Sequence, residues 1–129
     1  MKIAFNTTNI HQGGALQVAV SFIDEFCNDP EMNGCVVDLF ISSSVLNSLP
    51  EPDLVHKVFN KVTVNDAKGL CLSNINLWRI FNLYDKVFTL FGPSYMPKLN
   101  AFHIIGFGQA WVLSRKTEAY EVLLSLIHI

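Results

Sequence analysis

The residues of this chain best suited to chemistry form a glycine turn, Gly13-Gly14, between a short apolar run and a helical pattern. The apolar run at residues 3–5 predicts a buried strand, and polar residues follow it directly. From residue 14 to residue 28, apolar side chains recur at three- and four-residue steps, which predicts an amphipathic helix. The first amides of such a helix have no partner within it, and the helix dipole adds partial positive charge there.

Two interpretations of this turn stay open. A glycine pair lets an anionic ligand approach the free amides without meeting a Cβ atom. The same pair fits a tight strand-to-helix turn that binds nothing, because the stretch has neither the GxGxxG pattern nor the lysine of a phosphate-binding loop. His11, two residues before Gly13, is placed to meet an anion, but a solvated loop histidine fits the pattern equally well.

The turn belongs to a repeated alternation of strand, loop and helix. The pattern predicts strands near residues 2–6, 35–41, 57–64, 86–91 and 102–107, with helices near 14–28, 42–49, 69–84 and 117–126. The almost wholly apolar strand at 35–41 favours burial on both faces, as in a parallel sheet. We therefore expect an α/β fold, a Rossmann-like three-layer domain with helices on both faces of a parallel sheet. Ligands of such sheets bind in the loops after the strands.

Composition and charge restrict the class of function. The chain has 129 residues, of which 50% are apolar and 16% charged, and a net charge of -2. This balance fits one globular domain and gives no basic footprint, so we expect no nucleic acid partner. The sequence has neither a signal peptide nor the roughly 18 consecutive apolar residues of a membrane span. Its three cysteines have no metal-binding or redox spacing, which predicts a cytoplasmic protein without a metal or a cofactor.

Two stretches resemble one known family. Residues 10–19, Ile-His-Gln-Gly-Gly-Ala-Leu-Gln-Val-Ala, with the helix that follows them, resemble the opening of GT-B glycosyltransferases of family 4. Residues 87–95 and 103–108 resemble a later part of the same amino-terminal domain. In a subgroup of bacterial saccharide-building enzymes this part is similar, with a TxFGPxY loop and then a GFA strand end, whose alanine is replaced here by Gly108. The resemblance covers roughly residues 1–115.

The resemblance implies the acceptor-side half of a two-domain, retaining glycosyltransferase that needs no metal. Such an enzyme transfers a sugar from a nucleotide-sugar donor to a saccharide or lipid-linked acceptor, in some cases at the inner face of the membrane. It also implies roles for six residues. The donor diphosphate faces the turn formed by Gly13 and Gly14, beside His11. The matched loop contributes Gly92 and Tyr95 to substrate binding, and His103 corresponds to a catalytic histidine near a strand end, although a core or edge histidine fits its apolar neighbours as well.

The carboxyl end departs from the family. A donor-binding half has a pair of glutamates in an E-x7-E arrangement, whereas only two residues separate Glu118 from Glu121. We expect a Rossmann-like domain over residues 1–115 and a truncated or foreign tail over residues 116–129, with the carboxy-terminal partner domain missing. An alternative from a different class is a non-catalytic α/β module that binds a small anion or a protein partner at the Gly13-Gly14 turn.

Overall fold

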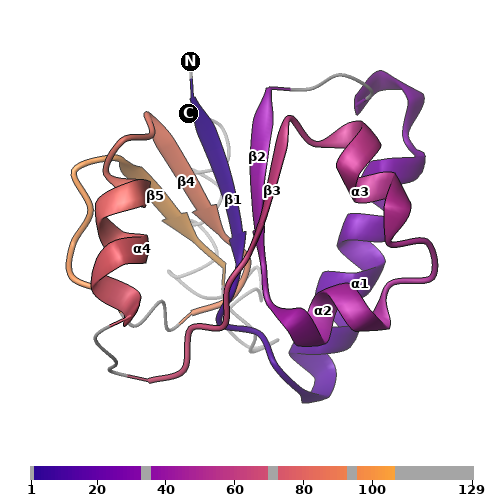
Figure 1. Cartoon of the computed structure of the whole chain (residues 1–129), viewed down its shortest axis with the longest axis horizontal. Coiled ribbons are helices and arrows are strands. Elements are labelled where there is room, and N and C mark those ends of the chain that lie inside the picture. The colour runs from indigo at the N-terminus through magenta and orange to yellow at the C-terminus, as the bar shows by residue number, and fades with distance from the viewer. Residues whose placement is uncertain (1, 33–35, 70–72, 93–95, 107–129) are drawn as a thin grey trace, which may run out of the picture.

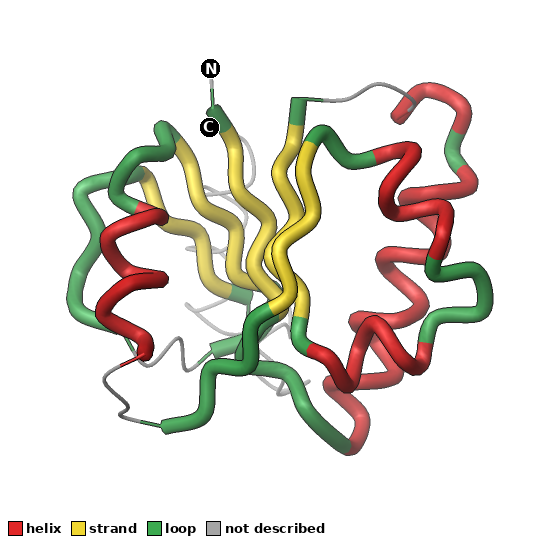
Figure 2. The backbone as a smooth tube through the Cα atoms, viewed as in Figure 1, coloured by secondary structure: helices red, strands yellow, loops and turns green. Residues whose placement is uncertain are grey.

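The computed structural model describes residues 2–32, 36–69, 73–92 and 96–106. Within these ranges, strands and helices alternate along the chain (Figures 1 and 2). In chain order the elements are β1 (Ile3–Thr7), α1 (Gly13–Asn28), the 3-10 turn η1 (Pro30–Met32), β2 (Val37–Ile41), α2 (Ser43–Ser48), α3 (Asp53–Val58), β3 (Lys61–Val64), α4 (Ser73–Phe81), β4 (Lys86–Thr89) and β5 (Phe102–Ile105).

The five strands form one sheet in which every neighbouring pair is parallel, in the order β3-β2-β1-β4-β5. This confirms the predicted parallel sheet. β1 lies at its centre, and its residues Ala4 and Phe5 are buried on opposite faces. The chain proceeds from β1 outward to β3 and then crosses back to β4, so the strand order reverses between β1 and β4. In open α/β sheets, the carboxyl ends of the strands at such a reversal are the usual place for a ligand.

Helices cover both faces of the sheet, which confirms the predicted three layers (Figure 1). On one face, α1, α2 and α3 bury apolar side chains such as Ile23 and Val55 against the strands. On the other face, α4 contributes Leu77 and Phe81, and the Phe81 ring meets Phe40 of β2 edge-on, with 4.7 Å between ring centroids. Each face of the sheet therefore has its own apolar core.

The helix predicted near residues 14–28 is α1. Its residues Ala19, Ile23 and Cys27 follow one another at four-residue steps and are all buried, so they form one apolar stripe against the sheet. The helix ends where Asp29 adopts an extended conformation, and the Asp29 amide donates to the Phe26 carbonyl at 3.4 Å. No helix in the described ranges has both the length and the apolarity needed to cross a membrane.

The strand predicted over residues 57–64 is wrong in its first half. Only Lys61–Val64 forms a strand, and residues 57 and 58 belong to α3. The β-branched residue Val58 suggested a strand, but Val55 and Val58 are three residues apart and lie on one side of a helix, where both are buried in the core beneath α1. Burial of this helical face outweighs the intrinsic β propensity of valine.

The other predicted elements that the structure describes are present, most of them with shorter boundaries. β2 begins at Val37 and β4 ends at Thr89, while α4 ends at Phe81, before the predicted helix end at residue 84. β1 and β5 agree with their predictions to within one residue where the chain is described. Residues 35, 70–72, 107 and 117–126, which also belonged to predicted elements, lie outside the described residues.

Candidate functional site

The turn between β1 and α1 lies at the carboxyl edge of the sheet, beside the point where the strand order reverses. α1 begins at Gly13, after Gln12 in an extended conformation. The Gln12 side chain makes no capping hydrogen bond, and the first turn of α1 contains no acidic residue. The positive end of a 16-residue helix is therefore neither capped nor balanced by a carboxylate from its own first turn.

The two glycines of this turn differ in what the backbone demands. Gly13 has a φ of +73°, in the left-handed region that side chains with a Cβ atom rarely adopt. Gly14 has no such requirement, because its φ lies outside that region and a Cβ atom added there would meet nothing within 4 Å. The fold explains the glycine at position 13 but not the one at position 14.

The loop that leads to the turn is held by three contacts to neighbouring loops. The Ala67 amide donates to the Thr8 carbonyl at 3.0 Å, and the Ser42 hydroxyl donates to the Ile10 carbonyl at 2.5 Å. His11 adds the third contact, since its Nε2 lies 2.8 Å from the Ala67 carbonyl oxygen and must be the protonated donor there. These bonds join the loops that follow β1, β2 and β3, so the turn is fixed before any ligand arrives.

The structure turns His11 inward. Its Nδ1 atom is buried without a hydrogen bond and lies 3.9 Å from Asp66 Oδ1. Asp66 accepts hydrogen bonds from both the amide and the hydroxyl of Ser43, at the start of α2, and the amide bond is the main reason that the Asp66 pKa is lowered. Sequence reasoning missed Asp66 and Ser43, which are 23 residues apart. His11 ties the loops together and does not direct a ring nitrogen at the open side of the turn.

A second set of hydrogen-bonded polar side chains lies on the face of the sheet that α4 covers. Asn6 of β1 is fully buried, and its Oδ1 accepts from the amide and the hydroxyl of Thr8, at 3.0 and 2.6 Å. The Asn6 Nδ2 donates to Thr89 Oγ1 at 3.2 Å, and Thr89 Oγ1 lies 2.7 Å from His103 Nε2. Three strands thus contribute to one chain of hydrogen bonds that includes the predicted residue His103. No sequence signal pointed to Asn6 or Thr89 as its partners.

His103 is separated from the glycine turn. It pairs with Val87, whereas Thr89 pairs with Ile105 at the carboxyl end of the sheet, so His103 lies two residues, or about 6.6 Å, below that end. Residues paired across parallel strands point to the same face, and Val87 belongs to the core beneath α4. The ring of His103 is half-buried, and this desolvation lowers its pKa, so the imidazole is neutral at pH 7.

Gly92 has a packing role. Its amide donates to the Gly106 carbonyl at 3.3 Å, and a Cβ atom at position 92 would lie 3.1 Å from Ile105 Cγ2. The nearby Phe91 carbonyl accepts a 2.6 Å hydrogen bond from Asn9 Nδ2, which joins the loops after β1 and β4. Tyr95, the other predicted residue of this loop, lies outside the described residues.

The chemistry available at the carboxyl edge is the binding of an anion by backbone amides. Within residues 2–32, 36–69, 73–92 and 96–106, no group of three or more histidine, cysteine or carboxylate side chains is placed to hold a metal ion. Comparison of the chain with protein-family models, with curated proteins and with solved structures finds no match. The architecture is that of an α/β, Rossmann-like domain with a five-stranded parallel sheet.

Proposed function

We propose that this domain is the acceptor-side half of a retaining GT-B glycosyltransferase, which transfers a sugar from a nucleotide-sugar donor to a saccharide or lipid-linked acceptor. One observation carries the proposal. Gly14 is a glycine that neither backbone conformation nor packing requires, and it stands at the uncapped start of α1. A bound diphosphate would supply the missing reason for this glycine, because any side chain there would separate the ligand from the amides.

The same geometry suits the chemical step. Transfer breaks the bond between the anomeric carbon and the diphosphate oxygen, and the electron pair of that bond leaves with the diphosphate. Amides fixed at the start of a helix stabilise the charge that develops there and need no reorganisation during the reaction. The absence of a carboxylate from the first turn of α1 favours an anion at this position.

The proposal requires a second domain that binds the nucleotide sugar, since the sequence has no E-x7-E pair. The two domains would enclose the donor, with the Gly13-Gly14 turn facing its diphosphate. The location that fits this function is the cytoplasm, and a lipid-linked acceptor would bring the enzyme to the inner membrane face.

The anion site can be tested on the chain itself. In an NMR titration of the ¹⁵N-labelled protein with inorganic pyrophosphate, we expect the largest amide shifts at residues 14–16. The Gly14→Val variant should lose these shifts, whereas Gly69→Ala, which alters a left-handed glycine outside the turn, should keep them. Equal shifts in the wild-type protein and in Gly14→Val would contradict an anion site at this turn.

Catalysis is tested on the product of a reading frame that continues beyond residue 115 into an E-x7-E domain. We expect this protein to release nucleotide diphosphate from a nucleotide sugar only when an acceptor is present. Pyrophosphate binding without transfer by such a protein would instead support the non-catalytic anion-binding module. A frame without that domain would exclude the glycosyltransferase.

A further inference from the structure

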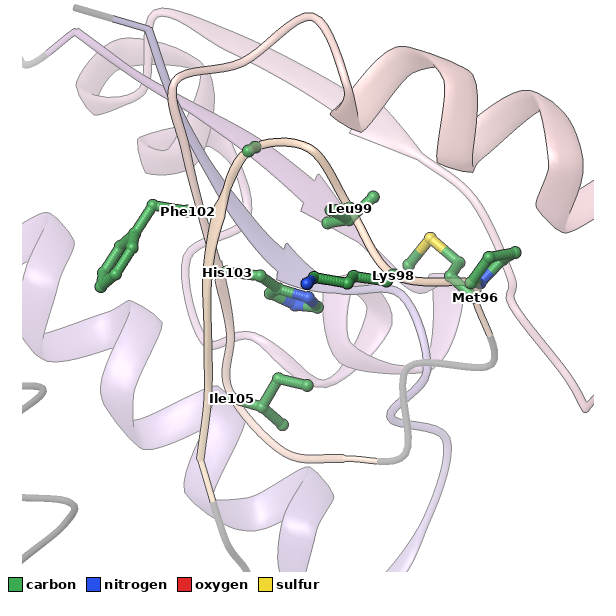
Figure 3. A pocket seen from close by; sticks show the side chains of 8 residues that line it. Met96, Lys98, Leu99, Phe102, His103 and Ile105 are labelled. Carbon is green, nitrogen blue, oxygen red and sulfur yellow. The ribbon is translucent and has the colours of Figure 1, made fainter.

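A cavity of about 420 Å³ lies between β5 and the segment that precedes it, away from the glycine turn (Figure 3). This volume lies within the range of small-molecule sites. Its outer wall is held against α4 by two hydrogen bonds, in which Trp78 Nε1 donates to the Lys98 carbonyl at 3.4 Å and the Asn100 amide donates to Asn82 Oδ1 at 2.8 Å. The cavity therefore has a defined wall even though it is open to solvent.

Two cationic or hydrogen-bonding side chains line this cavity, Lys98 and His103 (Figure 3). The remaining wall is largely apolar. It is formed by Met96, Pro97, Leu99, Ala101, Phe102 and Ile105. A ligand that fits such a lining has a charged or strongly polar end and an apolar body.

The hydrogen bonds behind His103 determine which of its ring nitrogens carries the proton. The Thr8 amide can only donate, so the atom of Asn6 that it meets is the carbonyl oxygen, and Asn6 Nδ2 must donate to Thr89 Oγ1. Thr89 is fully buried, and among the described residues the acceptor for its hydroxyl proton is His103 Nε2. His103 therefore accepts at Nε2 and carries its proton on Nδ1.

The Nδ1 proton has no protein acceptor among the described residues. A neutral imidazole with Nε2 occupied has one remaining polar function, which is to donate from Nδ1. In the same cavity the Lys98 side chain is exposed and forms no ion pair within the described part of the chain. Both groups can donate hydrogen bonds into the cavity, and neither has an acceptor atom left for a ligand in these states.

We propose that this cavity binds a small ligand through an oxyanion, a phosphate or a carboxylate, which accepts hydrogen bonds from His103 Nδ1 and Lys98. The apolar wall contacts the rest of the ligand. Thr89 and Asn6 are positioning residues, because they hold the imidazole in the tautomer that donates into the cavity. This site is independent of the proposed diphosphate site at the glycine turn.

The test uses three probes of similar size, phenyl phosphate, benzoate and benzyl alcohol, titrated at constant ionic strength into protein with ¹⁵N-labelled histidine rings. The chain has four histidines, and His103→Gln assigns the His103 signals by their disappearance. We expect an oxyanion probe to shift the His103 ring signals and the uncharged alcohol to have no effect. Preference for phenyl phosphate over benzoate would identify a phosphate ligand, and the reverse preference a carboxylate.

Two variants test the named donors. Lys98→Gln should weaken binding of the preferred probe by about tenfold, because a charge-assisted hydrogen bond is replaced by a neutral one. Thr89→Val should move the ring proton from Nδ1 to Nε2 and weaken the same binding, whereas Thr89→Ser, which keeps the hydroxyl, should restore both properties. The ¹⁵N shifts of the ring report the tautomer directly, even if Thr89→Val lowers stability.

Three results would overturn the proposal. The first is that no probe perturbs the His103 ring. The second is equal binding of the alcohol and the anions, which would describe an apolar pocket only. The third is a wild-type ring that carries its proton on Nε2, because Nδ1 could not then donate to a ligand.

Discussion

The two glycines of the turn before α1 allow a comparison in which one position reports on folding and its neighbour on ligand binding. A Cβ atom at position 14 would meet nothing within 4 Å, and the position needs no left-handed backbone. Because valine has a higher helix propensity than glycine, Gly14→Val should change the free energy of unfolding by no more than about 0.5 kcal/mol. Alanine at position 13 must keep a φ of +73°. The left-handed conformation costs a residue with a Cβ atom about 1–2 kcal/mol.

The expected melting temperatures follow from these free energies. At roughly 4 °C for each kcal/mol in a domain of this size, Gly13→Ala should melt about 4–8 °C below the wild-type protein, and Gly14→Val within about 2 °C of it. Binding should show a different pattern. Gly14→Val should abolish pyrophosphate binding, and in a complete enzyme it should reduce transfer on the order of a hundredfold, since the amides lose about 2.7 kcal/mol of transition-state stabilisation.

Thermal unfolding and a pyrophosphate titration, carried out on the same samples, measure both effects. Gly14→Ala is a graded comparison: its single methyl group obstructs the amides less than the valine side chain does, so it should weaken pyrophosphate binding by less. A Gly14→Val protein that melts much earlier but still binds pyrophosphate would refute the argument. That result would make glycine at position 14 a requirement of the turn.

Three further outcomes are expected from the packing and the titrating groups. Gly106→Ala should destabilise the fold by about 1–3 kcal/mol in urea unfolding, since the Cβ atom of the alanine would collide with the Leu90 carbonyl oxygen. If the variant is as stable as the wild-type protein, the end of β5 can shift away from Leu90. Burial lowers the His103 pKa below 6.5, so the unfolded chain binds more protons than the folded one just below that pH, and the free energy of unfolding should fall as the pH drops through this window. His103→Gln should flatten the pH profile of stability between pH 7 and 5. An unchanged slope in this variant would assign the pH dependence to other groups. Ser42→Ala should lower the free energy of unfolding by about 1–3 kcal/mol, because the buried hydroxyl both caps α2 and bonds to the loop before α1. Ser48→Ala, on the exposed side of α2, should change stability little, and equal effects of the two variants would contradict the capping role.

The error at α3 shows where local propensity misleads. The valine at position 58 favoured a strand, yet the helix had signals of its own. Asp53 lies in its first turn, and His56 and Lys57 lie in its last, an order of charges that complements the helix dipole. Pro52, the residue before the helix, is also common at helix starts. The charges indicated the element correctly, and the β-branched side chains did not.

Part of the candidate site could be predicted from the sequence, and part could not. The glycine turn could be predicted because its signal is local: a strand, two glycines and an amphipathic helix follow one another within 28 residues. His11 could be placed near the turn but not oriented, because its orientation depends on Ala67, which is 56 residues away. The spacing of residues along the sequence does not indicate which neighbouring loop will supply the carbonyl to which a histidine donates a hydrogen bond.

By itself, the sequence determined the class of fold, because apolar periodicity and turn residues act over a few neighbouring positions. It determined the place of α1 and of the glycine turn at its start for the same reason. Only the tertiary structure decided the strand order, and with it the meeting of Asn6 and Thr89, which are 83 residues apart. In the site that we propose, that contact directs the proton of His103 to Nδ1. The physical reason is that Asn6, Thr89 and His103 lie side by side on three strands in a largely buried place. Each polar hydrogen there must find an acceptor, and no local sequence pattern specifies which one.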